Sequence, residues 1–462
     1  MTNPAISRPR ASHATRPVPL PRVWRITAVD IVAVLIANGV IILAMWLRHD
    51  GLDQLSTLGG QLTVIGQLTG LYAAYLALIQ LVLMSRSPWL DQAFGMDGLA
   101  AAHRWLGFAT AWLLLGHGVF IVTGYALGDG STVVEEAVTL VTTYPYVLMA
   151  VVSGGLFGLV AVSSVRAARR RVSYETWYGL HLYAYLAVAL GFLHQLFVGA
   201  DFIHDPVAVG YWVALYAIAA ASIVVFRVGQ PVWLSARHRL RIANVVTEGP
   251  GVYSIYLTGR DLDRLAVRSG QYFLWRFLTR DGWWRAHPFS ISSAPNGAWL
   301  RITIKELGDW SKAVASISVG TRVVIEGPYG VLTGARRTRS KVLLVAGGIG
   351  ITPLRALLEA LPANPGDLTL LYRVRSVPEI IFRQELDALA QRRGARIHYL
   401  IGPRGEGVAD PLDATALLRL VPDVVERDVF LCGPASMMQR VEVSLRRLGL
   451  PQRQIHAERF AY

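Results

Sequence analysis

The chain has 462 residues, of which 53% are hydrophobic and only 16% charged, and its mean hydropathy is +0.40. Soluble proteins average about 25% charged residues, so much of the chain is expected in lipid, and its single cysteine, Cys432, excludes disulfides, zinc clusters and cysteine-ligated iron–sulfur centres. Arginines beside hydrophobic segments account for much of the +14 net charge, and no nucleic-acid-binding motif accompanies them, so we expect no nucleic-acid partner.

Residues 1–22 are rich in proline, serine and arginine and have no apolar period, which predicts a disordered cytoplasmic tail. Residues 23–230 contain six stretches of about the 20 residues that a bilayer-spanning helix needs. The predicted spans are Ile26–Leu47, Thr63–Met84, His103–Tyr125, Tyr144–Val165, Tyr174–Val198 and Val209–Val228. Arginines gather in the tail and in the loops after the second and fourth spans, while the opposite loops are acidic. Both termini are therefore predicted on the cytoplasmic side of the cell membrane.

Two of these spans each carry two histidines. His103 and His117 lie 14 residues apart on the third span, and His181 and His194 lie 13 apart on the fifth. Buried ionisable groups in lipid are rare and usually functional, and imidazole is a good iron ligand. We predict two b-type haems roughly 20 Å apart along the helices, one held by His103 with His181 and one by His117 with His194. A step of 13 residues leaves its two rings roughly 140° apart, so the fifth span needs a distortion near Gly191 or a compensating tilt.

Short β-rich runs follow the membrane region. They lie at Val252–Thr258, Tyr272–Phe277, Leu300–Ile304 and Arg322–Ile325, separated by Gly, Pro and Asp turns, and they predict an antiparallel β-barrel over residues 235–335. In residues 338–462 strands at Val342–Ala346, Leu368–Tyr372 and Val429–Leu431 alternate with helical patterns, which predicts a parallel α/β domain. The expected fold is a multidomain membrane protein with a six-helix di-haem bundle, a flavin-binding barrel and a nucleotide-binding α/β domain.

The barrel contains the sequence HPFSISSAP at His287–Pro295, which is suited to presenting the Ser290 hydroxyl to the N5 edge of a flavin and an aromatic ring to its face. Gly308-Asp309-Trp310-Ser311 predicts a glycine turn that opens a helix, which suits the pyrophosphate of FAD. The candidate FAD-binding residues are His287, Pro288, Phe289, Ser290, Ser293, Gly308, Trp310 and Ser311. Ordinary barrel turns would explain each motif alone, but they explain the ordered set poorly.

The α/β domain opens with a strand, a glycine turn and a helix. Backbone N–H groups and the helix dipole favour a nucleotide pyrophosphate there, and the candidate residues are Gly347, Gly348, Gly350, Thr352 and Pro353. At the end of the next strand Arg373 and Arg375 suit a 2′-phosphate, which favours NADPH over NADH, although two solvated arginines remain an alternative.

Further candidates lie near the end of the chain. Cys432-Gly433-Pro434 ends another strand, where a small thiol suits the nicotinamide. A C-terminal aromatic ring is placed to cover the flavin, with Phe460 as the first choice and Tyr462 as the second.

The paired histidines, HPFSISSAP, GDWS, GGIGITP, the CGP turn and the aromatic C-terminus resemble the ferric reductase and NADPH oxidase superfamily of membrane flavocytochromes. The resemblance implies a six-helix di-haem domain joined to a dehydrogenase of the ferredoxin–NADP reductase type. The shorter histidine gap and HPFS followed by GDWS are similar to the NADPH oxidase branch, in a bacterial, self-contained form without an obligate protein partner. Soluble members usually have Arg-x-Tyr-Ser in place of His287–Ser290, which weakens the transfer of an arginine–pyrophosphate contact to His287.

We expect electrons to pass from cytoplasmic NADPH through FAD and two haems to an external acceptor. Dioxygen, giving superoxide, is the first expected acceptor and a ferric chelate the second, and little in the sequence separates them. A partner-dependent cytochrome is disfavoured by the complete flavin and nucleotide motifs. A transporter with a fused reductase is disfavoured by the paired histidines.

Overall fold

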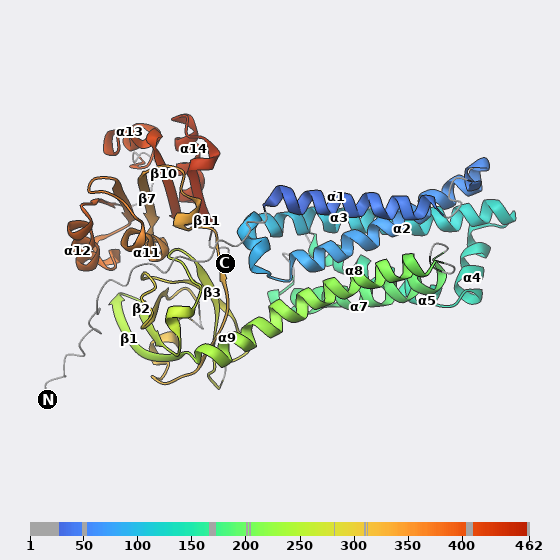
Figure 1. The fold of residues 1–462 in the computed structure, drawn as a ribbon, viewed down its shortest axis with the longest axis horizontal. Helices are drawn as coiled ribbons and strands as arrows, with labels where there is room; N and C mark the ends of the chain where they lie inside the picture. Colours follow the sequence, from blue (N-terminus) through green and yellow to red (C-terminus); the bar gives the residue numbers. More distant parts are fainter. Residues whose placement is uncertain are drawn as a thin grey trace. The chain divides into compact units, whose positions relative to one another are not determined.

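The computed structural model describes residues 27–48, 53–165, 172–199, 202, 205–280, 282–308, 311, 313–402 and 410–459 (Figure 1). The chain divides into two compact units, of which the membrane unit spans residues 25–228 and the other begins at Gly229. The predicted tail, the arginines after the fourth span, Trp310, Phe460 and Tyr462 lie outside the described residues. The cytoplasmic orientation of the termini therefore stays a prediction.

Six helices of the described chain are long and apolar enough to cross a membrane, which confirms the six predicted spans. They are α1 (Ala28–Leu47), α2 (Leu58–Leu83), α3 (Pro88–Asp129), α5 (Val147–Ser164), α7 (Tyr174–Val198) and α8 (Pro206–Val224). The short amphipathic helix α4 (Val133–Thr143) was not predicted. The predicted sixth span ends at Val228, where the membrane unit also ends, and the helix itself continues from α8 through a π-helical turn at Val225–Gly229 into α9 (Gln230–His238).

Acidic residues at the edges of these spans act as helix caps. The Thr27 N–H donates to Asp30 Oδ2 over 2.8 Å while Thr27 Oγ1 accepts from the Asp30 N–H, so the two residues form a capping box at the start of α1. Asp205 Oδ1 accepts N–H bonds from Val207 and Ala208 at the start of α8. These carboxylates satisfy N–H groups that the first helical turn leaves open, so Asp30 has a structural role at the end of its span.

The barrel consists of two three-stranded antiparallel sheets, ordered β1-β2-β5 and β4-β3-β6. Isolated bridges between Arg241 and Arg322 and between Ile291 and Ile302 join β1 to β6 and the end of β4 to β5, which links the two sheets into a ring. Alternate inward residues such as Phe273, Trp275 and Phe277 fill the interior. The strands are β1 (Arg241–Gly249), β2 (Val252–Thr258), β3 (Tyr272–Phe277), β4 (His287–Ser290), β5 (Leu300–Lys305) and β6 (Val323–Tyr329).

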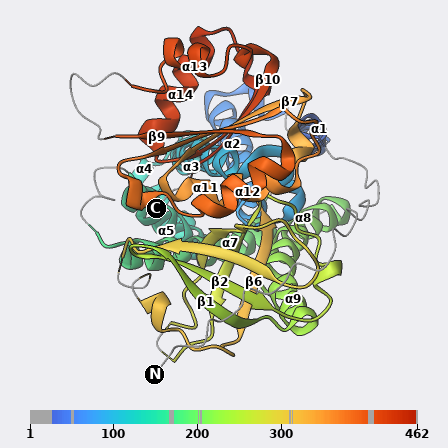
Figure 2. The ribbon, with the colours of Figure 1, turned by 90° about the vertical axis from the view of Figure 1, so that its left-hand side faces the viewer.

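The α/β domain is a five-stranded parallel sheet, ordered β11-β10-β7-β8-β9, with helices on both faces (Figure 2). Successive residues of β7 alternate between the faces: Val342 and Leu344 pack with α11 and α12, whereas Leu343 and Val345 pack with α13 and α14. The strands are β7 (Lys341–Gly347), β8 (Leu368–Val374), β9 (Arg396–Ile401), β10 (Arg427–Gly433) and β11 (Ile455–Arg459). The helices are α11 (Ile351–Ala360), α12 (Arg383–Arg393), α13 (Ala414–Leu420) and α14 (Ala435–Arg447). The strand order reverses between β7 and β10, the place where such sheets bind ligands.

Candidate functional site

The four membrane histidines face one another in the two predicted pairs. The ring centres of His103 and His181 are 5.9 Å apart, and those of His117 and His194 are 6.4 Å apart. Both pairs form between α3 and α7 although α7 is helical throughout Tyr174–Val198. Of the two expected alternatives, a break near Gly191 is not seen, and a compensating tilt stays a prediction.

This spacing fits a metal held between two imidazoles. Each metal–nitrogen bond is about 2 Å long, and each nitrogen lies about 1 Å from its ring centre. Two imidazole rings on opposite sides of one metal therefore have their ring centres roughly 6 Å apart. In the described chain no group of three His, Cys, Asp or Glu side chains could hold a bare metal ion. Two protein ligands at this spacing suit a metal whose remaining ligands come from a macrocycle, as in haem.

One ligand orientation is fixed by a helix contact. His117 Nδ1 lies 2.8 Å from the carbonyl oxygen of Gly66 on α2, which directs the opposite ring nitrogen away from that carbonyl. The close approach depends on glycine at position 70, because a Cβ atom there would meet the His117 ring. Two of the other histidines lack such a contact: the Nδ1 atoms of His103 and His194 are buried without a hydrogen-bond partner among the described residues.

The flavin motif, His287–Pro295, begins on β4, which pairs with β3 in the sheet β4-β3-β6. Ser290 pairs with Tyr272 of β3, and the Trp275 indole N–H donates to the carbonyl oxygen of Phe289 over 2.8 Å, which fixes the strand. The Ser290 side chain is 3% exposed, and its hydroxyl has no hydrogen-bond partner within the described part of the chain. A buried hydroxyl without a partner costs stability unless a ligand satisfies it. Ser290 therefore fits the role of a hydrogen-bond partner for a flavin.

The first residues of the motif stack on each other. The rings of His287 and Phe289 are stacked with centres 6.2 Å apart, and Pro288 between them is exposed. Burial, with a further contribution from Arg285, lowers the pKa of His287 to about 4. His287 is therefore neutral near pH 7 and does not replace the positive charge of an arginine at the flavin pyrophosphate.

Downstream, Ser311 bonds the backbone of two residues in the segment that follows β5. Its hydroxyl accepts the N–H groups of Leu307 and Gly308 and donates to the Gly308 carbonyl over 2.8 Å. The hydroxyl therefore orders the backbone at Leu307 and Gly308, and the predicted helix after Gly308 falls partly outside the described residues.

The glycine turn Gly347–Gly350, here called the nucleotide turn, packs against the end of β10. Cβ atoms at Gly347 and Gly350 would collide with Met437 and with the Cys432 carbonyl, so glycine allows the two turns to approach. Thr352 donates its hydroxyl to the Ile349 carbonyl over 3.0 Å, and Pro353 is buried in the first turn of α11, so both have structural roles. Gly348, at φ +53°, has open space around it and can face a ligand.

Cys432 is fully buried, and burial, followed by the nearby Glu458 carboxylate, raises the pKa of its thiol. It is consequently a neutral thiol that packs in the hydrophobic core of the α/β domain, and its predicted place beside the nicotinamide stays a prediction. Gly433 and Pro434 continue this turn, and both lie within van der Waals reach of Gly347.

The two arginines at the end of β8 differ in their environments: Arg373 belongs to the strand, and Arg375 follows it. Arg373 is 9% exposed, and its guanidinium Nη1 donates to the carbonyls of Val374 and Leu400 over 2.8 and 3.1 Å. Arg375 is exposed at the end of the strand. The expectation that both side chains reach a 2′-phosphate therefore changes: Arg373 supports the backbone, and Arg375 remains available to a ligand.

Sequence reasoning missed Glu458. Glu458 pairs with Cys432 in the parallel register of β10 and β11, and its carboxylate lies against Gly330 of the barrel. Its position in a strand beside β10 is the signal that points to it.

Comparisons with known proteins match the three parts separately. Three family profiles match: "Ferric reductase like transmembrane component" at residues 69–192, "FAD-binding domain" at 239–333 and "Oxidoreductase NAD-binding domain" at 344–442. A glycine betaine monooxygenase reductase subunit of Chromohalobacter salexigens is 30% identical over 49% of this chain and 65% of its own length. The ferredoxin reductase component of a 3-ketosteroid-9-alpha-monooxygenase of Rhodococcus rhodochrous is 30% identical over 48% and 64%.

The chain thus spans less than two thirds of the length of these curated relatives. Among solved structures, the FAD/NAD-binding domain of a nitric oxide dioxygenase from Vibrio cholerae is 25% identical. That match covers 48% of this chain and 99% of that one, with a TM-score of 0.39.

Proposed function

We propose that this chain, an oxidoreductase with the ferric-reductase-like membrane component and the FAD- and NAD-binding domains of ferric reductases and NADPH oxidases, carries electrons from NADPH across the membrane. The main support is the two pairs of facing histidine rings on α3 and α7, whose ring centres are 5.9 and 6.4 Å apart. Two such pairs on the same two helices, 14 and 13 residues apart, provide two successive positions for iron along the membrane unit.

The bound groups would supply the redox chemistry, with FAD taking a hydride and the haems carrying single electrons. The chain would bind and orient them. His103 with His181 and His117 with His194 would hold the irons, and Ser290 would donate a hydrogen bond to the flavin. The turn around Gly348 would bind the nucleotide pyrophosphate through its backbone N–H groups. Phe460 or Tyr462 would cover the flavin until nicotinamide arrives.

The curated relatives support the direction of electron flow. Both are named as reductase parts of monooxygenase systems. In this chain we propose that the corresponding domains supply electrons to the covalently attached membrane unit.

Changing Arg375 to alanine is expected to raise the KM for NADPH about 10-fold or more and to leave the KM for NADH nearly unchanged. The reason is that an exposed guanidinium at the end of β8 would bond only the extra phosphate, and such charged hydrogen bonds contribute roughly 1.5–3 kcal/mol. Arg396→Ala is the matched control, because this exposed arginine lies at the opposite end of the neighbouring strand β9. Steady-state kinetics with both nucleotides measure the effect. Equal use of NADH and NADPH by the wild type would refute the assignment.

Dioxygen is the proposed acceptor, and ferric chelate is the second candidate, favoured by the description of the profile that matches residues 69–192. The test is NADPH-dependent cytochrome c reduction in air by the full chain loaded with FAD and haem. Inhibition of this reduction by superoxide dismutase is expected. Rapid anaerobic reduction of a ferric chelate without superoxide production in air would instead identify a ferric reductase.

A further inference from the structure

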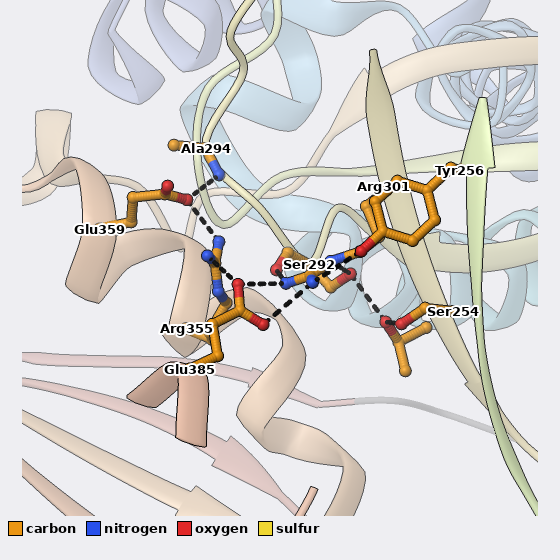
Figure 3. Close-up of polar contacts among 9 residues, drawn as sticks. Ser254, Tyr256, Ser292, Ala294, Arg301, Arg355, Glu359 and Glu385 are labelled. Atoms are coloured by element: carbon orange, nitrogen blue, oxygen red, sulfur yellow. Dashed lines mark hydrogen bonds and ion pairs between the residues drawn. The ribbon is translucent and has the colours of Figure 1, made fainter. Parts of the chain in front are cut away.

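A cluster of two arginines and two glutamates lies between the barrel and the α/β domain (Figure 3). Arg301 belongs to β5, Arg355 and Glu359 to α11, and Glu385 to α12. None of the four belongs to a motif that predicts cofactor binding. Their contacts nevertheless end on the flavin motif at one side and on the helix that follows the nucleotide turn at the other.

The Arg301 side chain binds the backbone of the flavin motif at Ser292. Its guanidinium Nη2 donates to the Ser292 carbonyl over 2.7 Å, and Nε donates to Ser292 Oγ over 3.1 Å. The same guanidinium forms a two-point ion pair with Glu385 over 3.0 and 3.3 Å and lies 4.6 Å from the ring centre of Phe382. A single side chain of the barrel thus connects residue 292 to the start of α12.

Arg355 extends the cluster to a second point on the motif. It pairs with Glu385 through one guanidinium nitrogen and with Glu359 through another. Glu359 Oε2 in turn accepts the backbone N–H of Ala294 over 2.7 Å. Ser292 and Ala294, two and four residues after Ser290, are therefore both bonded to this cluster.

The cluster is balanced in charge, and its two arginines are shielded from solvent. The side chains of Arg301 and Arg355 are 3% and 5% exposed, and two carboxylates neutralise two guanidinium groups. Buried ion pairs contribute little net stability compared with apolar packing, but they penalise any arrangement that separates the partners. Such a cluster favours the relative placement of the joined segments in which all four side chains are paired.

We propose that Arg301, Arg355, Glu359 and Glu385 are positioning residues that fix the flavin motif relative to the nucleotide turn for hydride transfer. α11 begins at Ile351, directly after the turn Gly347–Gly350, so the cluster ties the flavin-binding and nucleotide-binding segments through one short path. The proposal rests on the proposed function only in that NADPH reduces the bound flavin. Hydride transfer needs the two rings in close register, and a misplacement of about 1 Å can cost roughly 100-fold in rate.

The test is anaerobic stopped-flow reduction of the flavin by NADPH in the full chain, with Glu385→Gln as the main variant. This change keeps the side-chain size and removes the charge that both arginines share. We expect the limiting reduction rate to fall about 10- to 100-fold, while the nucleotide Kd stays within about threefold. The long-wavelength charge-transfer absorbance of stacked nicotinamide and flavin should weaken, a change that general loss of stability does not produce in chains that retain FAD.

Arg440→Gln is the matched control, because it removes a charge from the exposed 3.0 Å pair with Asp410 in the same domain. If Glu385→Gln loses FAD, Glu359→Gln is the second test. Glu359 is 35% exposed, and its replacement removes only the ion pair with Arg355 and the bond from the Ala294 amide. An unchanged limiting rate and charge-transfer band in the FAD-retaining variant would overturn the positioning role. A wild-type flavin that neither nucleotide reduces would contradict the proposed function itself.

Discussion

Replacing His117 by leucine is expected to lower the haem content from two per chain to one and to abolish electron transfer across the membrane. Leucine offers no lone pair to iron, so the pair with His194, 6.4 Å between ring centres, loses one ligand. The bond from His117 to the Gly66 carbonyl is lost as well. Reduction of the flavin by NADPH should continue, because the residues proposed for that step all lie beyond residue 229.

Haem content per chain and the reduced-minus-oxidised spectrum measure this effect. Trp112→Leu is the matched control: it lies five residues earlier on α3, is 71% exposed, and should leave both haems in place. A His117→Leu chain that keeps two haems would show that this ring does not hold iron.

Replacing Ser290 by alanine is expected to slow flavin reduction on the order of 100-fold with little change in FAD content. The Ser290 hydroxyl is buried and has no bond to any described residue, so a bound flavin is the partner that its position implies. Losing one positioned donor at a reacting centre typically costs this much in rate. The measurement is the limiting rate of anaerobic flavin reduction by NADPH.

Thr321→Ala provides the control for Ser290→Ala. Thr321 lies in the same domain, and its hydroxyl donates to the Ser318 carbonyl over 2.7 Å, a bond that involves no residue of the flavin motif. Its loss should lower thermal stability and leave the reduction rate nearly unchanged. Equal rates for Ser290→Ala and the wild type would remove Ser290 from the site.

The architecture was largely predictable because its signals are local. Long apolar stretches identify membrane helices, and the runs Val252–Thr258 and Tyr272–Phe277 coincide with β2 and β3. The helical region before His103 was not predicted. α3 begins at Pro88 and is kinked at Gly95, where φ is 72°, and this first part of the helix is less apolar than the span that follows it. α4 was missed because its helical period spans only 11 residues in a loop.

The site was predictable where it consists of motifs and not where it consists of contacts between distant residues. Histidine spacing identified both pairs, because α3 and α7 each place two rings along one axis. The bond from Arg301 to Glu385 joins residues 84 positions apart, and no local pattern encodes it. The burial of Arg373 was also hidden, because its sequence position marks the end of β8 but not that its guanidinium turns back onto backbone carbonyls.

Electron transfer from one side of the membrane to the other is tested most directly in proteoliposomes with cytochrome c trapped inside. NADPH, which does not cross the bilayer, is added outside to chains whose nucleotide domain faces outward. The trapped cytochrome c is expected to be reduced by the wild type and to stay oxidised with the His117→Leu chain. Reduction of an external acceptor only, with the trapped cytochrome c remaining oxidised in the wild type, would contradict electron transfer across the membrane.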